Sequence, residues 1–130
     1  MLSTDAAQLL QRSEDLLRAI AQRDWPAYEQ LCAPSLTAFE PEARGHLVSG
    51  LGFHRYYFDN APAQQGGVST IVGPHIRVMG DVGLVCYVRL VQQRDADGTF
   101  RTTAFEETRV WQRIDGQWRH VHFHRSANGQ

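Results

Sequence analysis

The sequence predicts an α+β fold, with N-terminal helices packed on a strongly curved antiparallel sheet. Two observations favour this class. Apolar residues recur with helical spacing only in about the first 60 positions, and β-branched and aromatic runs separated by turn residues fill the rest. The chain has 130 residues, 42% of them hydrophobic, which is enough for one core and too few for two ordinary domains. We therefore expect one domain over residues 1–130.

The first third of the chain predicts two helices. Between Asp5 and Arg23 the apolar residues form one stripe of a long amphipathic helix: Leu9, Leu10, Leu16, Leu17, Ile20 and Ala21. Asp24 is a suitable N-cap for a short second helix that tolerates Pro26 in its first turn. We expect Pro34 to end this second helix.

A short strand over Leu36–Phe39, an irregular segment over Glu42–Gly50 and a third helix over Leu51–Phe58 are expected next. In the third helix the aromatic side chains predict a buried stripe that leaves His54 outside it: Phe53, Tyr56 and Tyr57. The composition of Asp59–Gly67 is that of a loop between the helical part and the sheet.

The remaining residues predict five strands joined by short turns at Gly73-Pro74, Gly80-Asp81, Asp97-Gly98 and Asp115-Gly116. The strands are expected at Val68–Val72, His75–Met79, Val82–Arg94, Thr99–Ile114 and Gln117–Arg125. Turns this short require antiparallel neighbours, because a parallel return needs a longer crossover. The longest strands exceed the usual ~5 to 6 residues, so we expect the sheet to curl and to leave a pocket at its open end.

Charge and composition argue against several classes of partner. The formal net charge is -1, which gives no electrostatic footprint for nucleic acid or an anionic membrane. No signal peptide or membrane-spanning apolar run is found, so a cytoplasmic location is expected. Two cysteines, Cys32 and Cys86, without Cys-x-x-Cys spacing suggest neither a disulfide framework nor a thiolate metal site. No phosphate-binding glycine loop or hydrolase motif is present, and no cofactor is expected.

Three arginines lie on strands otherwise made of packing residues: Arg89, Arg109 and Arg125. Each shares strand parity with bulky side chains, so each guanidinium is a candidate to point inward. Buried arginines need a partner, either Glu40, Glu106 or Glu107 or the carboxylate of an anionic ligand. The alternative is that all three face solvent in cross-strand ion pairs.

The turn at Asp115-Gly116 decides which residues oppose one another. A two-residue turn would place Arg109 beside His122, and a three-residue loop with Gly116 in the left-handed region would place Arg109 beside Arg125. We predict the three-residue loop, which puts the two arginines on one face.

The histidines offer weaker candidates. His120, His122 and His124 alternate along one strand, which is a possible metal-ligand spacing, but no carboxylate or cysteine completes a site. We predict no metal and interpret the three as a polar face that meets another subunit. His54 is interpreted as a structural histidine, with a hydrogen-bond donor or general base in a pocket as the alternative.

Five strings together carry a resemblance to a known family: LTAFEPEA at 36–43, FHRYYFDN at 53–60, YVRL at 87–90, EETRVW at 106–111 and VHFHRS at 121–126. The chain resembles the association (hub) domain of calcium/calmodulin-dependent protein kinase II, with a core over about residues 9–126. The resemblance implies the cone-shaped, cystatin-like α+β roll of nuclear transport factor two, ketosteroid isomerase and scytalone dehydratase. It also implies self-association into dimers or rings of dimers, of a size that the sequence does not determine.

The same resemblance implies a pocket for small carboxylates formed by Arg89, Arg109 and Arg125, with His54 at its edge. We add Glu40 and Tyr57 to the predicted ligand-binding residues. The aromatic residue that family members carry after the FHxFYF string has no counterpart here, because Asn60 is followed by Ala61-Pro62-Ala63. Capping of a ligand by a lid is therefore not expected.

The sequence thus favours an oligomerisation module that binds a small anion. The kinase motifs, namely the glycine-rich loop and the His-Arg-Asp and Asp-Phe-Gly strings, are not found, so no kinase activity of its own is expected. One alternative is an isomerase, dehydratase or hydrolase of the same fold, with His54 or Glu40 as general base. Another is a pure scaffold whose arginines satisfy internal carboxylates.

Overall fold

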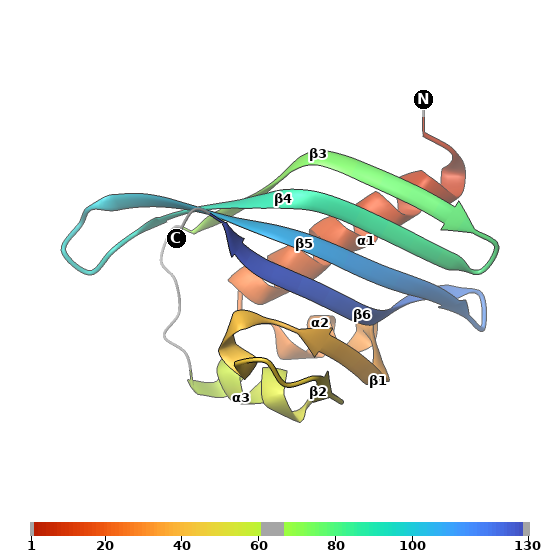
Figure 1. Cartoon of the computed structure of the whole chain (residues 1–130), viewed down its shortest axis with the longest axis horizontal. Helices are drawn as coiled ribbons and strands as arrows, with labels where there is room; N and C mark the ends of the chain where they lie inside the picture. Colours follow the sequence, from red (N-terminus) through yellow and green to blue (C-terminus); the bar gives the residue numbers. More distant parts are fainter. Residues whose placement is uncertain (1, 61–66, 129–130) are drawn as a thin grey trace.

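The computed structural model describes residues 2–60 and 67–128 (Figure 1). Its helices are α1 (Thr4–Ala21), α2 (Trp25–Leu31), the 3-10 turn η1 (Pro41–Ala43) and α3 (Gly52–Asn60). Its strands are β1 (Cys32–Phe39), β2 (Val48–Ser49), β3 (Val68–Met79), β4 (Val82–Arg94), β5 (Phe100–Ile114) and β6 (Gln117–Asn128). The α+β class predicted from the sequence is confirmed. Most of the predicted loop over Asp59–Gly67 lies outside the described residues.

The first two helices follow the predicted capping chemistry. Ser3 accepts a hydrogen bond from the amide of Ala6 at the start of α1, and Asp24 accepts one from Ala27 at the start of α2. The end of α2 differs from the prediction, because the helix stops at Leu31 where Cys32 becomes extended, and Pro34 lies inside β1. Strand pairing therefore ends this helix before the proline is reached.

Helix α3 turns a different face inward from the one predicted. His54 is 8% exposed, whereas Tyr56 is 65% and Tyr57 38% exposed. Phe53 and Phe58 are partly buried and pack against the core. The predicted stripe is therefore right for Phe53 but wrong for Tyr56, Tyr57 and His54, because the helix directs His54 to the carboxylate of Glu40.

The six strands form one sheet in the order β2-β1-β6-β5-β4-β3. Strands β3 to β6 pair antiparallel as predicted, but β1 pairs parallel with β6, so the sheet is mixed and not purely antiparallel. The segment between β1 and the later strands contains α3, which gives the chain the length that a parallel partner requires. The strong curvature expected for the sheet stays a prediction.

Two predicted strands are one. The turn expected at Gly73-Pro74 is a register shift within β3, whose pairs with β4 pass from Val72 opposite Val88 to His75 opposite Cys86. Gly73 has φ +60, and Pro74 offers no amide donor to a ladder. Both are tolerated here because β3 is an edge strand.

The β5–β6 hairpin has a two-residue turn, contrary to the three-residue loop predicted. Ile114 pairs with Gln117, and Asp115 and Gly116 both have positive φ, as a type I′ turn requires. A register shift follows between Val110 and Trp111: Trp111 opposes His120, but Val110 opposes His122. Val121 is the extra residue in β6, and it changes the parity of every pair beyond it.

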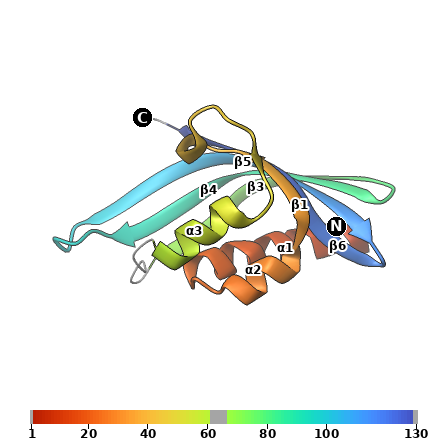
Figure 2. The same ribbon diagram turned by 90° about the horizontal axis from the view of Figure 1, so that it is seen from below.

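The core lies between the sheet and the helices, which cover one face of it (Figure 2). The fully buried side chains come from both layers: Leu9 and Leu16 of α1, Tyr28 of α2, Leu36 of β1, Val85 of β4 and Trp111 of β5. At Gly83 of β4 a Cβ atom would lie 2.4 Å from Leu9 Cδ1, so glycine permits the close approach of α1. Among the described residues no helix is long and apolar enough to cross a membrane.

Candidate functional site

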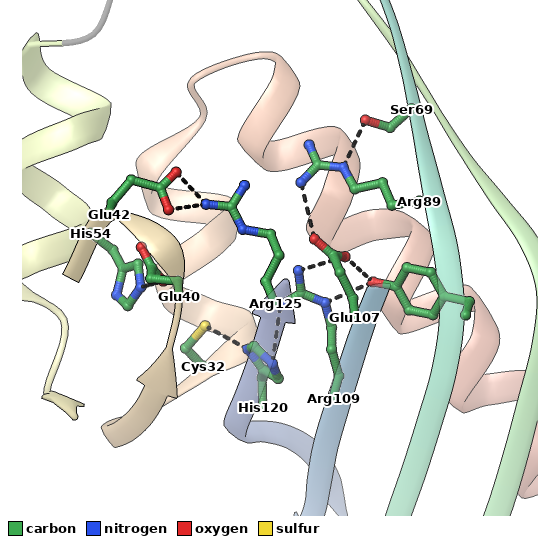
Figure 3. A network of polar contacts seen from close by, with 11 residues as sticks. Cys32, Glu40, Glu42, His54, Ser69, Arg89, Glu107, Arg109, His120 and Arg125 are labelled. Carbon is green, nitrogen blue, oxygen red and sulfur yellow. Dashed lines mark hydrogen bonds and ion pairs between the residues drawn. The ribbon is translucent and has the colours of Figure 1, made fainter. Parts of the chain in front are cut away.

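A cavity of about 280 Å³ opens between the helices and the inner face of strands β3 to β6. All six residues predicted to bind a ligand line it: Arg89, Arg109, Arg125, Glu40, His54 and Tyr57. Figure 3 shows the three arginines converging from β4, β5 and β6, with Glu40 and His54 on the opposite side. The structure therefore brings these residues together, and their role as ligand-binding residues stays a prediction.

The polar network at the floor of the cavity is centred on Glu107 of β5. Its side chain is fully buried, and one oxygen accepts from the Tyr87 hydroxyl at 2.6 Å and from Arg109 Nη2 at 3.0 Å. The other oxygen accepts from Arg89 Nη1 at 3.4 Å. Burial alone would raise the pKa of Glu107, but the Arg109 and Arg89 cations outweigh burial and hold that pKa below 4.5. Glu107 is therefore an ionised carboxylate shared by two guanidiniums.

Arg109 is 2% exposed, and its guanidinium has several polar and aromatic partners. Its Nε donates to the Tyr87 hydroxyl at 2.8 Å, and its guanidinium carbon lies 4.7 Å from the centre of the Phe123 ring. Burial alone would lower the pKa of Arg109, but the oxygens of Tyr87 and Glu107 raise this pKa by more than burial lowers it. Arg109 stays a cation and is held in place as part of the fold.

Arg89 is held less completely. Its Nε donates to Ser69 Oγ on β3 at 3.1 Å, and its only carboxylate contact among the described residues is the long one to Glu107. Burial lowers the pKa of Arg89, although Glu107 opposes that effect. Arg89 therefore carries a desolvated positive charge, and it shares the carboxylate that offsets this charge, Glu107, with Arg109.

Arg125 of β6 stands opposite Glu107 of β5 in the register. Its guanidinium stacks 4.9 Å from the centre of the Phe105 ring, and its Nη2 donates to both oxygens of Glu42 in η1. The Arg125 side chain is 16% exposed and the Glu42 side chain 36% exposed. This ion pair therefore lies at the mouth of the cavity.

Glu40 and His54 form a buried pair on the opposite side of the cavity. Glu40 Oε2 lies 2.9 Å from His54 Nε2, and the two side chains are 6% and 9% exposed. His54 Nδ1 is buried without a hydrogen-bond partner among the described residues. The sequence did not reveal a base with an orienting carboxylate, and this pair has that arrangement.

The three histidines of β6 do not share a face, because the extra residue Val121 places His120 on a different face from His122 and His124. His120 is fully buried, with Nε2 3.3 Å from Arg109 Nη1 and Nδ1 3.7 Å from Cys32 Sγ. Burial, helped by the Arg109 cation, lowers the pKa of His120 well below 6.5. His122 instead contacts Thr37 Oγ1 at 2.7 Å, and His124 is exposed. Within residues 2–60 and 67–128 no three potential ligands gather as a metal site would require.

Sequence reasoning missed several residues of this site, namely Tyr87, Ser69 and Glu42. Parity could have found Tyr87 and could have selected Glu107 over Glu106, because only Glu107 alternates onto the face of Arg109. Glu106 is exposed, and Glu40 pairs with His54 and with none of the three arginines. No periodic signal in the sequence points to Glu42 or Ser69.

Comparison with known proteins extends these observations. Residues 5–129 match the family described as "Calcium/calmodulin dependent protein kinase II association domain". The rabbit (Oryctolagus cuniculus) calcium/calmodulin-dependent protein kinase type II subunit delta is 46% identical over 124 residues. That match covers 93% of this chain but 23% of the kinase subunit, so the chain spans about a quarter of its relative.

Solved structures agree with the family match. The Chlamydamonas reinhardtii CamKII hub homology domain is 46% identical, with a TM-score of 0.88 and coverage of 95% of this chain and 98% of that one. A nuclear transport factor 2-like protein from Salmonella enterica is 20% identical over 96% of this chain and 92% of its own, with a TM-score of 0.79, and it shows the shared fold. This chain belongs to the calcium/calmodulin-dependent protein kinase II association domain family, which implies that it assembles with copies of itself.

Proposed function

We propose that this chain is a hub-like oligomerisation module whose arginine-lined cavity binds a small carboxylate. The observation that carries the proposal is the sharing of one buried carboxylate, Glu107, by two buried guanidiniums, Arg89 and Arg109. Two positive charges against one negative charge leave a surplus of one in a poorly solvated place. An incoming carboxylate would offset the lost hydration of that surplus charge.

Arg89 is the group we assign to the first contact with the ligand. Its contact with Glu107 is 0.4 Å longer than that of Arg109, 3.4 Å against 3.0 Å, and among the described residues its other hydrogen-bond partner is the neutral Ser69 hydroxyl. Burial already disfavours the charge of Arg89, so a carboxylate within hydrogen-bond distance would stabilise this guanidinium more than the well-paired guanidinium of Arg109. The cavity of about 280 Å³ limits the ligand to a small molecule.

Assembly is the second part of the proposal. We place residues 1–130 in one domain, located in the cytoplasm, that forms a dimer or a ring of dimers and has no kinase activity of its own. Ligand binding would alter the assembly only if the ligand prefers one assembly state over another. Light scattering with and without a bound carboxylate measures that coupling.

Calorimetric titration with butyrate and acetate tests the pocket. We expect heat of binding for the wild type and at least a tenfold loss of affinity in Arg89→Gln, because the ligand loses its charged partner. Arg77→Gln is the matched control, since Arg77 is an exposed arginine on the neighbouring strand β3. An affinity equal in Arg89→Gln and the wild type would refute carboxylate binding at this site.

A second candidate function is general-base catalysis, which the Glu40–His54 pair favours. Glu40 orients the imidazole from one side, and the other ring nitrogen lacks a partner among the described residues. Turnover of a carbonyl or hydroxy-acid substrate should then disappear in His54→Ala and fall in Glu40→Gln. Activity that persists in both variants would remove this candidate.

A further inference from the structure

We propose that Glu42 is a resident carboxylate that restricts the cavity to ligands with a single carboxylate. The inference rests on the carboxylate binding proposed above and makes Glu42 its specificity-determining residue. The starting observation is that Arg125, one of the three arginines of the cavity, already binds a carboxylate that the chain itself supplies (Figure 3).

The geometry gives Glu42 the position that a second ligand carboxylate would take. Arg125 is fixed by its stacking on Phe105 and by its place on β6, and its Nη2 donates to both oxygens of Glu42. A carboxylate tethered to the same chain competes with dissolved anions at an effective concentration on the order of millimolar. A weak external carboxylate therefore meets Arg125 already occupied.

Burial separates the replaceable carboxylate from the fixed one. Glu107 has no exposed side-chain area and lies between Arg89 and Arg109, so its removal would leave buried charges without a partner. The Glu42 side chain is 36% exposed and borders both the cavity and an outer groove that includes Arg44 and His46. Glu42 could turn toward solvent at little cost, because its side chain is already partly exposed.

The charges around the cavity then discriminate between ligands. A monocarboxylate can use Arg89 and leave the Arg125–Glu42 pair intact. A dicarboxylate must place its second charge close to Glu42 and to the buried Glu40, or must displace Glu42 from Arg125. Like charges at short distance in a partly buried site oppose one another, so the second carboxylate weakens binding.

Titration calorimetry with butyrate and succinate at neutral pH tests this role. Glu42→Gln should bind succinate about tenfold more tightly than the wild type, whereas butyrate affinity should change less than about threefold. Glu106→Gln is the matched control, because it removes the same charge from an exposed position on β5. It should leave the ratio of the two affinities unchanged.

A double variant separates the specific effect from a general change in charge. Adding Arg125→Gln to Glu42→Gln should abolish the improvement for succinate, since the second carboxylate loses its partner. An improvement that persists in the double variant, or that is equal for both probes, would overturn the role of Glu42.

The same titrations distinguish the two proposals. Butyrate binding to the wild type with an unchanged succinate-to-butyrate ratio in Glu42→Gln refutes only the role of Glu42. Absence of binding by either probe to the wild type and to Glu42→Gln refutes the carboxylate pocket itself. Glu42→Ala, with circular dichroism to check folding, repeats the test without the amide that glutamine introduces.

Discussion

Arg109 and Arg125 point into one cavity from neighbouring strands, but their carboxylate partners differ in exposure. The side chain of Glu107 is fully buried, whereas that of Glu42 is 36% exposed. Tyr87 and Arg89 also bind Glu107, while Glu42 is bound by Arg125. The Arg109–Glu107 pair at the floor of the cavity is therefore part of the folded core. The Arg125–Glu42 pair at its mouth is one in which the carboxylate can be replaced.

Removing the charge of Glu107 should have the largest effect on stability. Glu107→Gln leaves Arg89 and Arg109 buried without a neutralising carboxylate, so we expect the free energy of unfolding to fall by about 3 to 5 kcal/mol. Urea unfolding at one fixed protein concentration measures it, because the self-association proposed above would also contribute to stability. Glu106→Gln, the exposed neighbour, should change stability by less than about 0.5 kcal/mol. Equal losses in the two variants would contradict the structural role of Glu107 at the floor of the cavity.

Acid should weaken the floor of the cavity through His120. Its pKa in the folded protein lies well below 6.5, because burial and the nearby Arg109 cation disfavour the imidazolium, with smaller effects from His54 and His122. The stability contributed by neutral His120 is present above the unfolded-state pKa of about 6.5 and is lost as pH falls below it. The unfolding free energy should drop by up to about 1.4 kcal/mol per pH unit more steeply in the wild type than in His120→Asn.

Unfolding by urea between pH 7 and pH 5 gives this slope. His124→Asn is the matched control, since His124 is an exposed histidine of the same strand and should keep the wild-type slope. A slope that does not change in His120→Asn would show that another group accounts for the acid sensitivity.

Loss of the mouth pair should have the smallest effect. Arg125→Gln should lower the free energy of unfolding by no more than about 1 kcal/mol, because the partner it leaves, Glu42, is already in contact with water. Thermal and urea unfolding beside Glu107→Gln measure the contrast directly. A loss as large as that of Glu107→Gln would place Arg125 in the structural core after all.

Local patterns in the sequence predicted most of the framework. Strand β4 has the predicted bounds Val82–Arg94, and Asp24 caps α2 as expected. Alternation along the strands also identified three inward arginines, because period two depends only on neighbouring residues. These features required no knowledge of distant contacts.

The errors arose where distant segments decide the outcome. The parallel pairing of β1 with β6 joins residues about 90 positions apart, as in Cys32 opposite His120, and no turn residue signals it. The face of α3 depended on whether a histidine or aromatic rings pack inward, and the buried carboxylate of Glu40 selects His54. Glu42 reaches Arg125 from a 3-10 turn, whose side-chain direction no periodicity predicts.

Val121 sets the phase of the last strand. If Val121 were paired regularly instead of bulged, the side chains after it would lie on the opposite face, and Phe123 and Arg125 would leave the cavity for the outer surface. An insertion, or a deletion at a regularly paired position, between the hairpin turn and Arg125 should therefore be far more harmful than a substitution there. A His-x-His-x-His string, which on a regular strand suggests three aligned imidazoles, is divided here into one interior histidine and two on the other side.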